Sequence, residues 1–123
     1  MDQFVQITIL ILIIVYSALH IYYTRGNDTC CVVGIFKNES HVIREWVMHY
    51  QHQGVTKIFL IDNGSTDDWR VQIADVLDSL VEVVHDPTQH SQIHLYNKHF
   101  LQKVRAYTWC AIVDMDEFMY ARK

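Results

Sequence analysis

The sequence predicts an α/β fold with a doubly wound, mostly parallel sheet, preceded by one N-terminal transmembrane helix. Residues 4–23 form one long apolar stretch, and beyond residue 30 short apolar runs suited to buried strands alternate with segments of helical spacing. Such alternation is typical of parallel strands joined by right-handed helical crossovers. We therefore divide the chain into a transmembrane anchor (1–25), a linker (26–30) and one domain (31–123).

The apolar stretch from Phe4 to Tyr23 would span roughly 30 Å as a helix, which is enough to cross a bilayer. Tyrosines at its far end and Arg25 just beyond it suit the membrane interface. A cleaved signal peptide is the alternative, but such peptides usually have a cationic start and a small-residue exit, whereas this segment begins Met-Asp-Gln. We therefore predict a single-pass membrane protein with an uncleaved anchor.

The charge pattern excludes one class of partner but leaves the side of the membrane open. A net charge of -4 without any basic run gives no electrostatic footprint for nucleic acid. Basic residues after the apolar stretch favour a cytoplasmic domain, whereas N-x-S/T sequons at Asn27, Asn38 and Asn63 would suit a secretory compartment.

Cysteine and histidine residues do not form a recognisable metal site. Cys30 and Cys31 are adjacent and Cys110 is distant, so we interpret them as small core side chains; a bridge from Cys31 to Cys110 would require neighbouring strands. His90 and His94 have helical spacing but lack a Cys or carboxylate at ligand distance. We interpret them as solvated or loosely packed histidines.

The first half of the domain predicts two strands joined by a helix. Cys30 to Phe36 is a compact apolar run suited to a buried strand. Asn38 or Ser40 can cap the helix that follows, and Gly54 supplies its end. The apolar residues of that helix recur at helical spacing and are Val42, Ile43, Trp46, Val47 and Tyr50. A second strand is predicted from Lys57 to Ile61.

The second half continues the alternation. A Gly-containing turn leads to a helix from about Asp67 to Ser79, for which Thr66 is the expected N-cap. A short strand follows from Leu80 to Val84, and after a polar loop an amphipathic helix runs from Leu95 to Tyr107. The last strand is the apolar run that begins at Trp109, which we expect to be buried.

That last run stops at three carboxylates, Asp114, Asp116 and Glu117. Carboxylates this close repel one another, and a hard divalent cation that carries a phosphorylated ligand would offset their charge. A solvated acidic turn after a core strand is the alternative for so short a motif.

Polar clusters at residues 37–40, 62–67 and 114–117 each follow a predicted strand. The carboxyl ends of parallel strands share one edge, so the clusters should gather where open α/β sheets bind ligands. Asp62 can accept hydrogen bonds from a base or ribose, and the backbone around Gly64 can approach a ligand closely. A plain loop with a helix cap is the alternative for residues 62–67.

The ordered motifs resemble those of family 2-like and family 92 glycosyltransferases. The residues that carry the resemblance are Lys37-Asn38-Glu39, Glu45-Trp46, the run from Gly54 to Asp67, Trp109, and Asp114-Met115-Asp116-Glu117-Phe118. The resemblance covers about Cys31 to Tyr120. It implies a GT-A type, Rossmann-like nucleotide-sugar-binding fold that transfers a sugar from a nucleoside diphosphate donor, with Mn²⁺ or Mg²⁺ as cofactor.

Carried over position by position, the resemblance implies specific roles. Asp62 would contact the base, while Asp114 and Asp116 would form the D-x-D pair that holds the ribose and the metal-bound diphosphate, with Asp116 as the first choice for direct ligation. Such a cation would stabilise the charge of the departing diphosphate. Pattern and resemblance together give the expected donor-binding residues as Asn38, Glu39, Asp62, Gly64 and Asp114, and the expected metal ligands as Asp114 and Asp116.

Only nine residues follow Asp114, whereas the family continues with an acceptor-binding half that supplies the catalytic base of inverting members. We therefore expect a fragment of a longer enzyme or a truncated relative, and we assign no catalytic residue. The acceptor would be an unknown glycan, lipid or protein. Two other classes remain: a non-catalytic membrane-anchored interaction module derived from a glycosyltransferase, and an aspartate phosphatase, which would place its acidic motif on an early strand.

Overall fold

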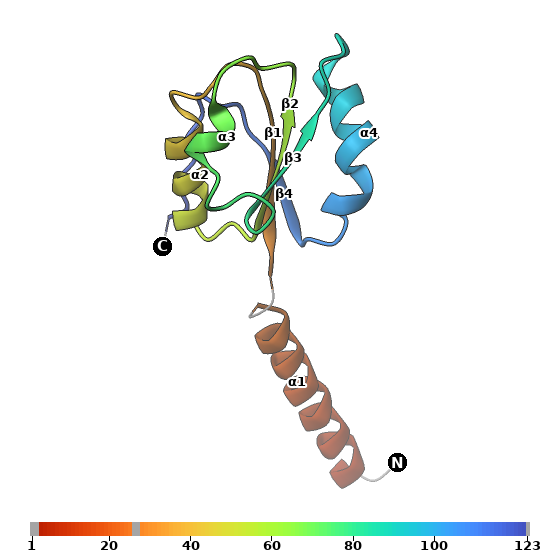
Figure 1. Cartoon of the computed structure of the whole chain (residues 1–123). Helices are drawn as coiled ribbons and strands as arrows, with labels where there is room; N and C mark the ends of the chain where they lie inside the picture. The colour runs from red at the N-terminus through yellow and green to blue at the C-terminus, as the bar shows by residue number, and fades with distance from the viewer. Residues whose placement is uncertain (1–2, 26–27, 123) are drawn as a thin grey trace.

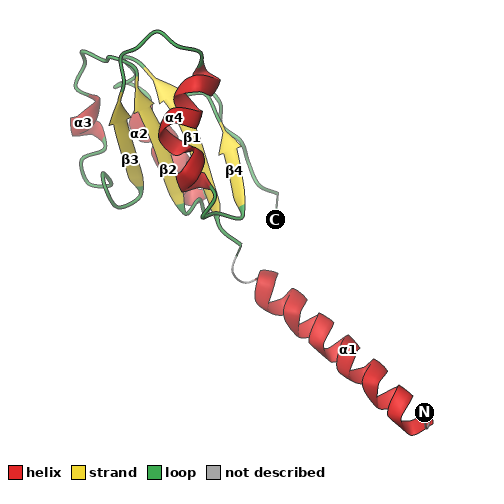
Figure 2. Ribbon diagram, turned by 90° about the vertical axis from the view of Figure 1, so that its right-hand side faces the viewer, coloured by secondary structure: helices red, strands yellow, loops and turns green. Residues whose placement is uncertain are grey.

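The computed structural model describes residues 3–25 and 28–122 of the chain. Within these residues an apolar helix precedes a three-layer domain, in which a four-stranded sheet lies between helices (Figures 1 and 2). Part of the predicted linker, at 26–27, and the sequon asparagine at position 27 lie outside the described residues.

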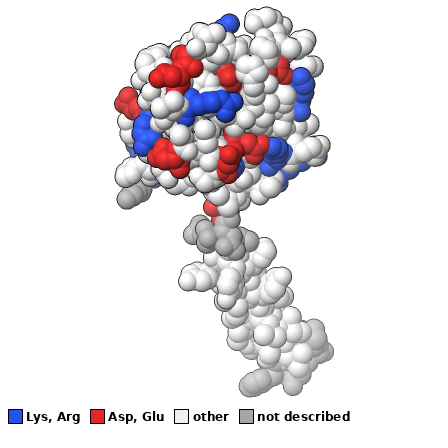
Figure 3. Space-filling view, in the orientation of Figure 1, with Lys and Arg blue, Asp and Glu red and all other residues white. Residues whose placement is uncertain are grey.

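The N-terminal helix, α1, runs from Gln3 to Arg25. Its segment from Val5 to Tyr23 has a mean hydropathy of 2.1, is exposed, and carries no charged side chain (Figure 3). A helix of these 19 residues is roughly 28 Å long, close to the thickness of a bilayer's hydrocarbon core. The expected apolar helix is therefore present, and by length and composition it can serve as a membrane anchor or as a signal sequence.

The sheet consists of β1 (Cys30–Phe36), β2 (Lys57–Asp62), β3 (Val81–His85) and β4 (Trp109–Ile112). All neighbouring strands pair in parallel, in the order β3-β2-β1-β4. The chain moves outward from β1 to β3 and then crosses back to place β4 on the other side of β1. The predicted α/β fold with a parallel sheet is confirmed, and the strand order reverses between β1 and β4.

Helices cover both faces of the sheet (Figure 2). α2 (Ile43–His52) and α3 (Trp69–Gln72) lie on one face, and α4 (Gln92–Val104) lies on the other. Every residue of β2 after Lys57 is buried, as expected for a central parallel strand with helices on both sides. The core side chains include Trp46, Ile58 and Leu60 on the α2 side, and Phe59, Ile61 and Phe100 on the α4 side.

The helix predicted from Asp67 to Ser79 is wrong, because only the single turn of α3 forms there. The polar residues expected to begin this helix bond to the preceding loop instead. The carboxylate of Asp67 accepts the backbone N–H of Ser40 at 2.8 Å, and the N–H of Thr66 donates to the side chain of Asn38 at 2.8 Å. Neither α2 nor α3 has a side-chain N-cap, so the expected N-caps are also wrong, whereas α2 ends just before Gly54 as predicted.

α4 begins at Gln92, before the predicted start at Leu95. Ser91 caps it, since its hydroxyl accepts the backbone N–H of His94 at 3.3 Å. This cap adds nearly one turn to the helix and brings its first residues to the carboxyl edge of the sheet.

β4 is an exposed edge strand rather than the buried strand that we expected. It pairs with β1 alone within the described chain, and Trp109 and Ile112 are 65% and 63% exposed. The pairing places Cys110 opposite Cys31, although both thiols are free. Burial, followed by the nearby Cys110, raises the pKa of Cys31 to about 12, so Cys31 behaves as a small core side chain. Cys110 is exposed, so the same expectation is wrong for it.

A buried carboxylate fastens α4 to the end of β3. Asp86 is 5% exposed, and its Oδ2 lies 2.8 Å from Nζ of Lys98 and 2.6 Å from Nε2 of His99, both on α4. The hydroxyl of Thr88 also donates to this carboxylate. The bond from the Lys98 ammonium, followed by those from Thr88 and His99, holds the pKa of Asp86 well below its usual range.

We expect Asp86→Asn to lower the melting temperature at neutral pH. Because the pKa of Asp86 is depressed in the folded state, the stability that it contributes is present above its unfolded pKa, about 3.9, and is lost as pH falls through the folded value. Thermal unfolding followed by circular dichroism should therefore show the difference between wild type and variant shrinking below about pH 4. The matched control is Asp68→Asn, at an exposed aspartate without a capping bond. A difference that stays constant with pH would contradict the assignment.

Candidate functional site

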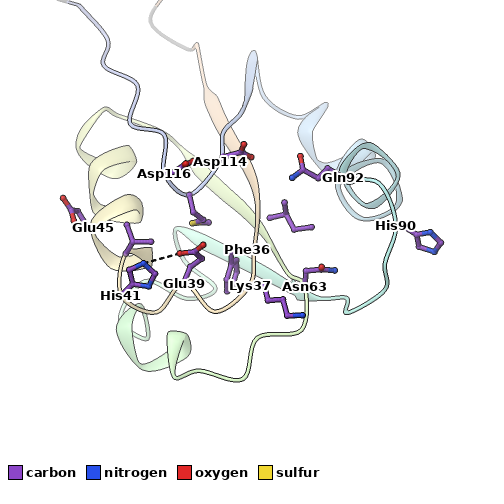
Figure 4. A pocket seen from close by; sticks show the side chains of 13 residues that line it. Phe36, Lys37, Glu39, His41, Glu45, Asn63, His90, Gln92, Asp114 and Asp116 are labelled. Atoms are coloured by element: carbon purple, nitrogen blue, oxygen red, sulfur yellow. Dashed lines mark ion pairs between the residues drawn. The ribbon is translucent and has the colours of Figure 1, made fainter.

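A cavity of about 720 Å³ opens at the carboxyl edge of the sheet, beside the ends of β1 and β4 (Figure 4). This is the point where the strand order reverses, and open α/β sheets bind ligands at such points. Its size suits a small-molecule ligand. The lining residues are Ile35, Phe36, Lys37, Glu39, His41, Val42, Glu45, Asn63, His90, Gln92, Asp114, Met115 and Asp116.

The cavity is acidic, with the carboxylates of Glu39, Glu45, Asp114 and Asp116 set against the single lysine Lys37. An anionic ligand would meet repulsion here unless a cation accompanied it. Within the described residues, no group of three or more His, Cys, Asp or Glu side chains is arranged to hold a metal ion. A cation at this site would therefore need ligands from the bound molecule as well, as Mg²⁺ often does with phosphates.

Asp114 and Asp116 lie on the turn that follows β4, and both are exposed. No side chain of the described residues donates a hydrogen bond to either carboxylate. Glu117 differs, because its carboxylate accepts the backbone N–H of Asp114 at 3.0 Å and closes the turn. The turn therefore holds its own shape while two carboxylates stay available to a ligand.

Two side chains of α2 fix the backbone of this turn. Trp46, which is fully buried, donates from Nε1 to the carbonyl of Asp114 at 2.9 Å. The hydroxyl of Tyr50 donates to the carbonyl of Glu117 at 3.0 Å and accepts the N–H of Met119 at 3.1 Å. Burial raises the pKa of Tyr50, so its hydroxyl stays protonated and able to donate.

Asn38 and Glu39 both follow β1, but only Glu39 lines the cavity. Asn38 has a positive φ of 56°; its N–H donates to the hydroxyl of Ser65 at 2.9 Å, and its side-chain oxygen accepts the N–H of Thr66. It thereby joins the loops after β1 and β2 and does not line the cavity. Glu39 lines the cavity, with its carboxylate 3.6 Å from Nε2 of His41 (Figure 4).

Asp62 lies at the same sheet edge but not in the cavity wall. It is 3% exposed; its carboxylate accepts the N–H of Ser65 at 2.8 Å and lies 2.9 Å from Nδ1 of His85. Burial by itself raises the pKa of Asp62, but the bonds from His85 and Ser65 outweigh it and lower the pKa. The next residue, Asn63, lines the cavity, whereas Gly64 does not. The role of Asp62 toward a base stays a prediction.

The sequence did not indicate that residues at the start of α4 line the cavity. His90 and Gln92 line the cavity, and Tyr96 lies one turn after Gln92 on the same helix. Burial, followed by the negative charge of Asp114, raises the pKa of Tyr96 to about 12. The signal that could have revealed this face is Ser91 as a helix cap, which would have placed Gln92 and Tyr96 on one side of the helix.

These features define an α/β domain with a parallel sheet, a cavity at the strand-order reversal and an acidic turn beside it. Residues 27–123 match the sequence profile of glycosyltransferase family 92. The chain therefore belongs to glycosyltransferase family 92, and the family 92 resemblance predicted from its motifs is confirmed.

Two relatives show what share of a family 92 protein's length this chain covers. A glycosyltransferase family 92 protein of Ricinus communis is 27% identical over 96 residues, which cover 73% of this chain and 17% of that protein. A glycosyltransferase family 92 protein of Oryza sativa subsp. japonica is 25% identical over 105 residues, which cover 80% of this chain and 17% of that protein. The chain thus spans about 17% of the length of these relatives.

We expect Tyr50→Phe to lower the free energy of unfolding by about 1–3 kcal/mol, because the N–H of Met119 and the carbonyl of Glu117 both lose a partner. Urea unfolding measures this change. Tyr120→Phe is the matched control, since Tyr120 is 75% exposed and should tolerate loss of its hydroxyl. Equal stability of Tyr50→Phe and wild type would show that this hydroxyl does not hold the turn.

Proposed function

We propose that this domain binds a nucleoside diphosphate sugar in the cavity, together with Mn²⁺ or Mg²⁺ at Asp114 and Asp116. The observation that carries the proposal is the meeting of Glu39, Asp114 and Asp116 at one cavity where the strand order reverses. Membership of glycosyltransferase family 92 supports sugar transfer as the class of reaction. Donor binding for sugar transfer is thus assigned to the cavity beside the ends of β1 and β4.

The charges of the cavity favour a cation-dependent ligand. The exposed oxygens of Asp114 and Asp116 have no competing donors among the described residues, and hard divalent cations prefer such oxygens. A diphosphate would supply further ligands, and the bound cation would neutralise charge on the departing diphosphate. Lys37 offers a second positive group to the same anion.

Asn63 is suited to meet the uncharged part of the donor. Its side-chain nitrogen already donates to the carbonyls of Asp86 and Thr88, at 2.7 and 3.0 Å. The amide orientation is therefore fixed, and its oxygen is the atom left to accept a hydrogen bond from a base or ribose. In this proposal Asp62 and Asn38 support the loop that carries Asn63.

Transfer of the sugar requires an acceptor, for which we propose a glycan, lipid or protein. Because the chain spans about 17% of its relatives, we assign donor binding to this domain and transfer to a protein completed by an acceptor-binding half. The residues of this chain bind and orient the donor, and no catalytic base is assigned. If α1 anchors the protein, the amino edge of the sheet lies toward the membrane and the cavity opens at the opposite edge.

A non-catalytic interaction module is the second candidate. The observation that favours it is the exposed edge of β4, where Trp109 and Ile112 face solvent beside unpaired backbone groups. Such a module would not need a donor ligand in the cavity. The two candidates therefore differ in their response to nucleoside diphosphates.

Thermal melting of the full chain in detergent, with Mn²⁺ and either UDP or GDP, tests the proposal. A ligand selective for the folded state, at about 100 times its Kd, adds about 2.7 kcal/mol of stability and should raise the melting temperature on the order of 10 °C. Asp116→Asn should abolish the shift, whereas the exposed control Asp68→Asn, outside the cavity, should retain it. No shift of the wild type with either nucleotide would favour the interaction module.

A further inference from the structure

One polar atom beside the cavity is buried and unpaired. Tyr96 is 7% exposed, and its hydroxyl has no hydrogen-bond partner among the described residues. A buried hydroxyl without a partner is unfavourable, and most buried polar groups in folded proteins are paired. A phenylalanine would fill the same space without this cost, so the hydroxyl calls for an explanation beyond packing.

The position of Tyr96 links this hydroxyl to the cavity. Tyr96 packs in the core cluster on the α4 side together with Ile35, and Ile35 lines the cavity. Gln92, one turn earlier on α4, lines it as well. Tyr96 therefore belongs to the cluster that packs against a residue of the cavity wall, and the negative charge of Asp114 acts on its hydroxyl.

The carboxylate of Asp114 can accept the hydrogen bond that the hydroxyl of Tyr96 can donate. This carboxylate is an acceptor without a donor among the described side chains, and because it is exposed, water satisfies it. A ligand that fills the cavity removes that water, and a carboxylate taken out of water needs new donors. Tyr96 has an O–H beside the cavity wall that no other group of the described chain uses.

We propose that Tyr96 is a positioning residue of this cavity, whose hydroxyl donates a hydrogen bond to the carboxylate of Asp114 when a nucleoside diphosphate fills the site. One carboxylate oxygen is then held by the phenol, and the other is directed at the ligand or its cation. This inference rests on the proposed function. It assigns to α4 a part in donor binding that the acidic motif alone does not indicate.

The test is Tyr96→Phe in the full chain, in which the Kd for nucleotide should change while the melting temperature without ligand does not fall. Titration calorimetry with Mn²⁺ and UDP or GDP should show a Kd raised about tenfold to a hundredfold, as for loss of a hydrogen bond to a charged group. The melting temperature without ligand should be unchanged or higher, because the variant loses no hydrogen bond of the unliganded protein. Tyr107→Phe is the control, since Tyr107 packs against the same cluster and should leave both values unchanged.

A double-mutant cycle separates positioning from general structure. If Tyr96 acts through Asp114, then Tyr96→Phe should change the Kd little in a chain that already carries Asp114→Ala. An unchanged Kd for Tyr96→Phe in a wild type that binds nucleotide would overturn the inference, and so would a large loss of melting temperature without ligand. Failure of the wild type to bind either nucleotide would instead remove the proposed function.

Discussion

The parallel pairing of β4 with β1 is the constraint on which the cavity depends. Four residue pairs, from Cys30 with Trp109 to Val33 with Ile112, bring the chain back across the sheet. The N–H of Val113 then donates to the carbonyl of Val33 at 3.0 Å, so the contact continues beyond the strand. Without this return the turn after β4 would not lie beside the end of β1.

Gly34 allows the two segments to approach so closely. A Cβ at this position would lie 3.0 Å from the carbonyl oxygen of Val113 and 3.2 Å from a methyl group of Leu60. Neither the backbone nor the buried leucine can move away easily, because both belong to the packed centre of the sheet. The small residue on β1 thus helps to set where the acidic turn begins.

Buried side chains hold the backbone around the cavity and leave the carboxylates of Asp114 and Asp116 free. Trp46 and Tyr50 fix the turn after β4 from one side, and Asp62 and Asp86 fix the loops after β2 and β3. Pairing of the buried groups gives the site a defined shape before any ligand binds. The same division of roles makes the unpaired hydroxyl of Tyr96 an exception that ligand binding would resolve.

The candidate site was predicted in part. The carboxyl edge of the sheet and the acidic residues Glu39, Asp114 and Asp116 could be named from the pattern, because each follows an apolar strand and all strands run in parallel. The pattern could not show that Asp62 is engaged by His85, which is 23 positions away. Local periodicity likewise predicted a long helix after residue 67, where bonds between two loops favoured a shorter one.

The sequence by itself was sufficient to predict an apolar N-terminal helix, an alternating α/β domain and acidic groups at one edge of the sheet. It could do so because hydrophobic spacing and strand ends are local properties of the chain. Only the folded arrangement decided which acidic side chains reach the cavity and which hold loops. It also decided that β4 is an exposed edge and that the hydroxyl of Tyr96 is buried without a partner in the core cluster beside the cavity. These outcomes depend on strand order and on hydrogen bonds between residues far apart along the chain, for which no local pattern carries a signal.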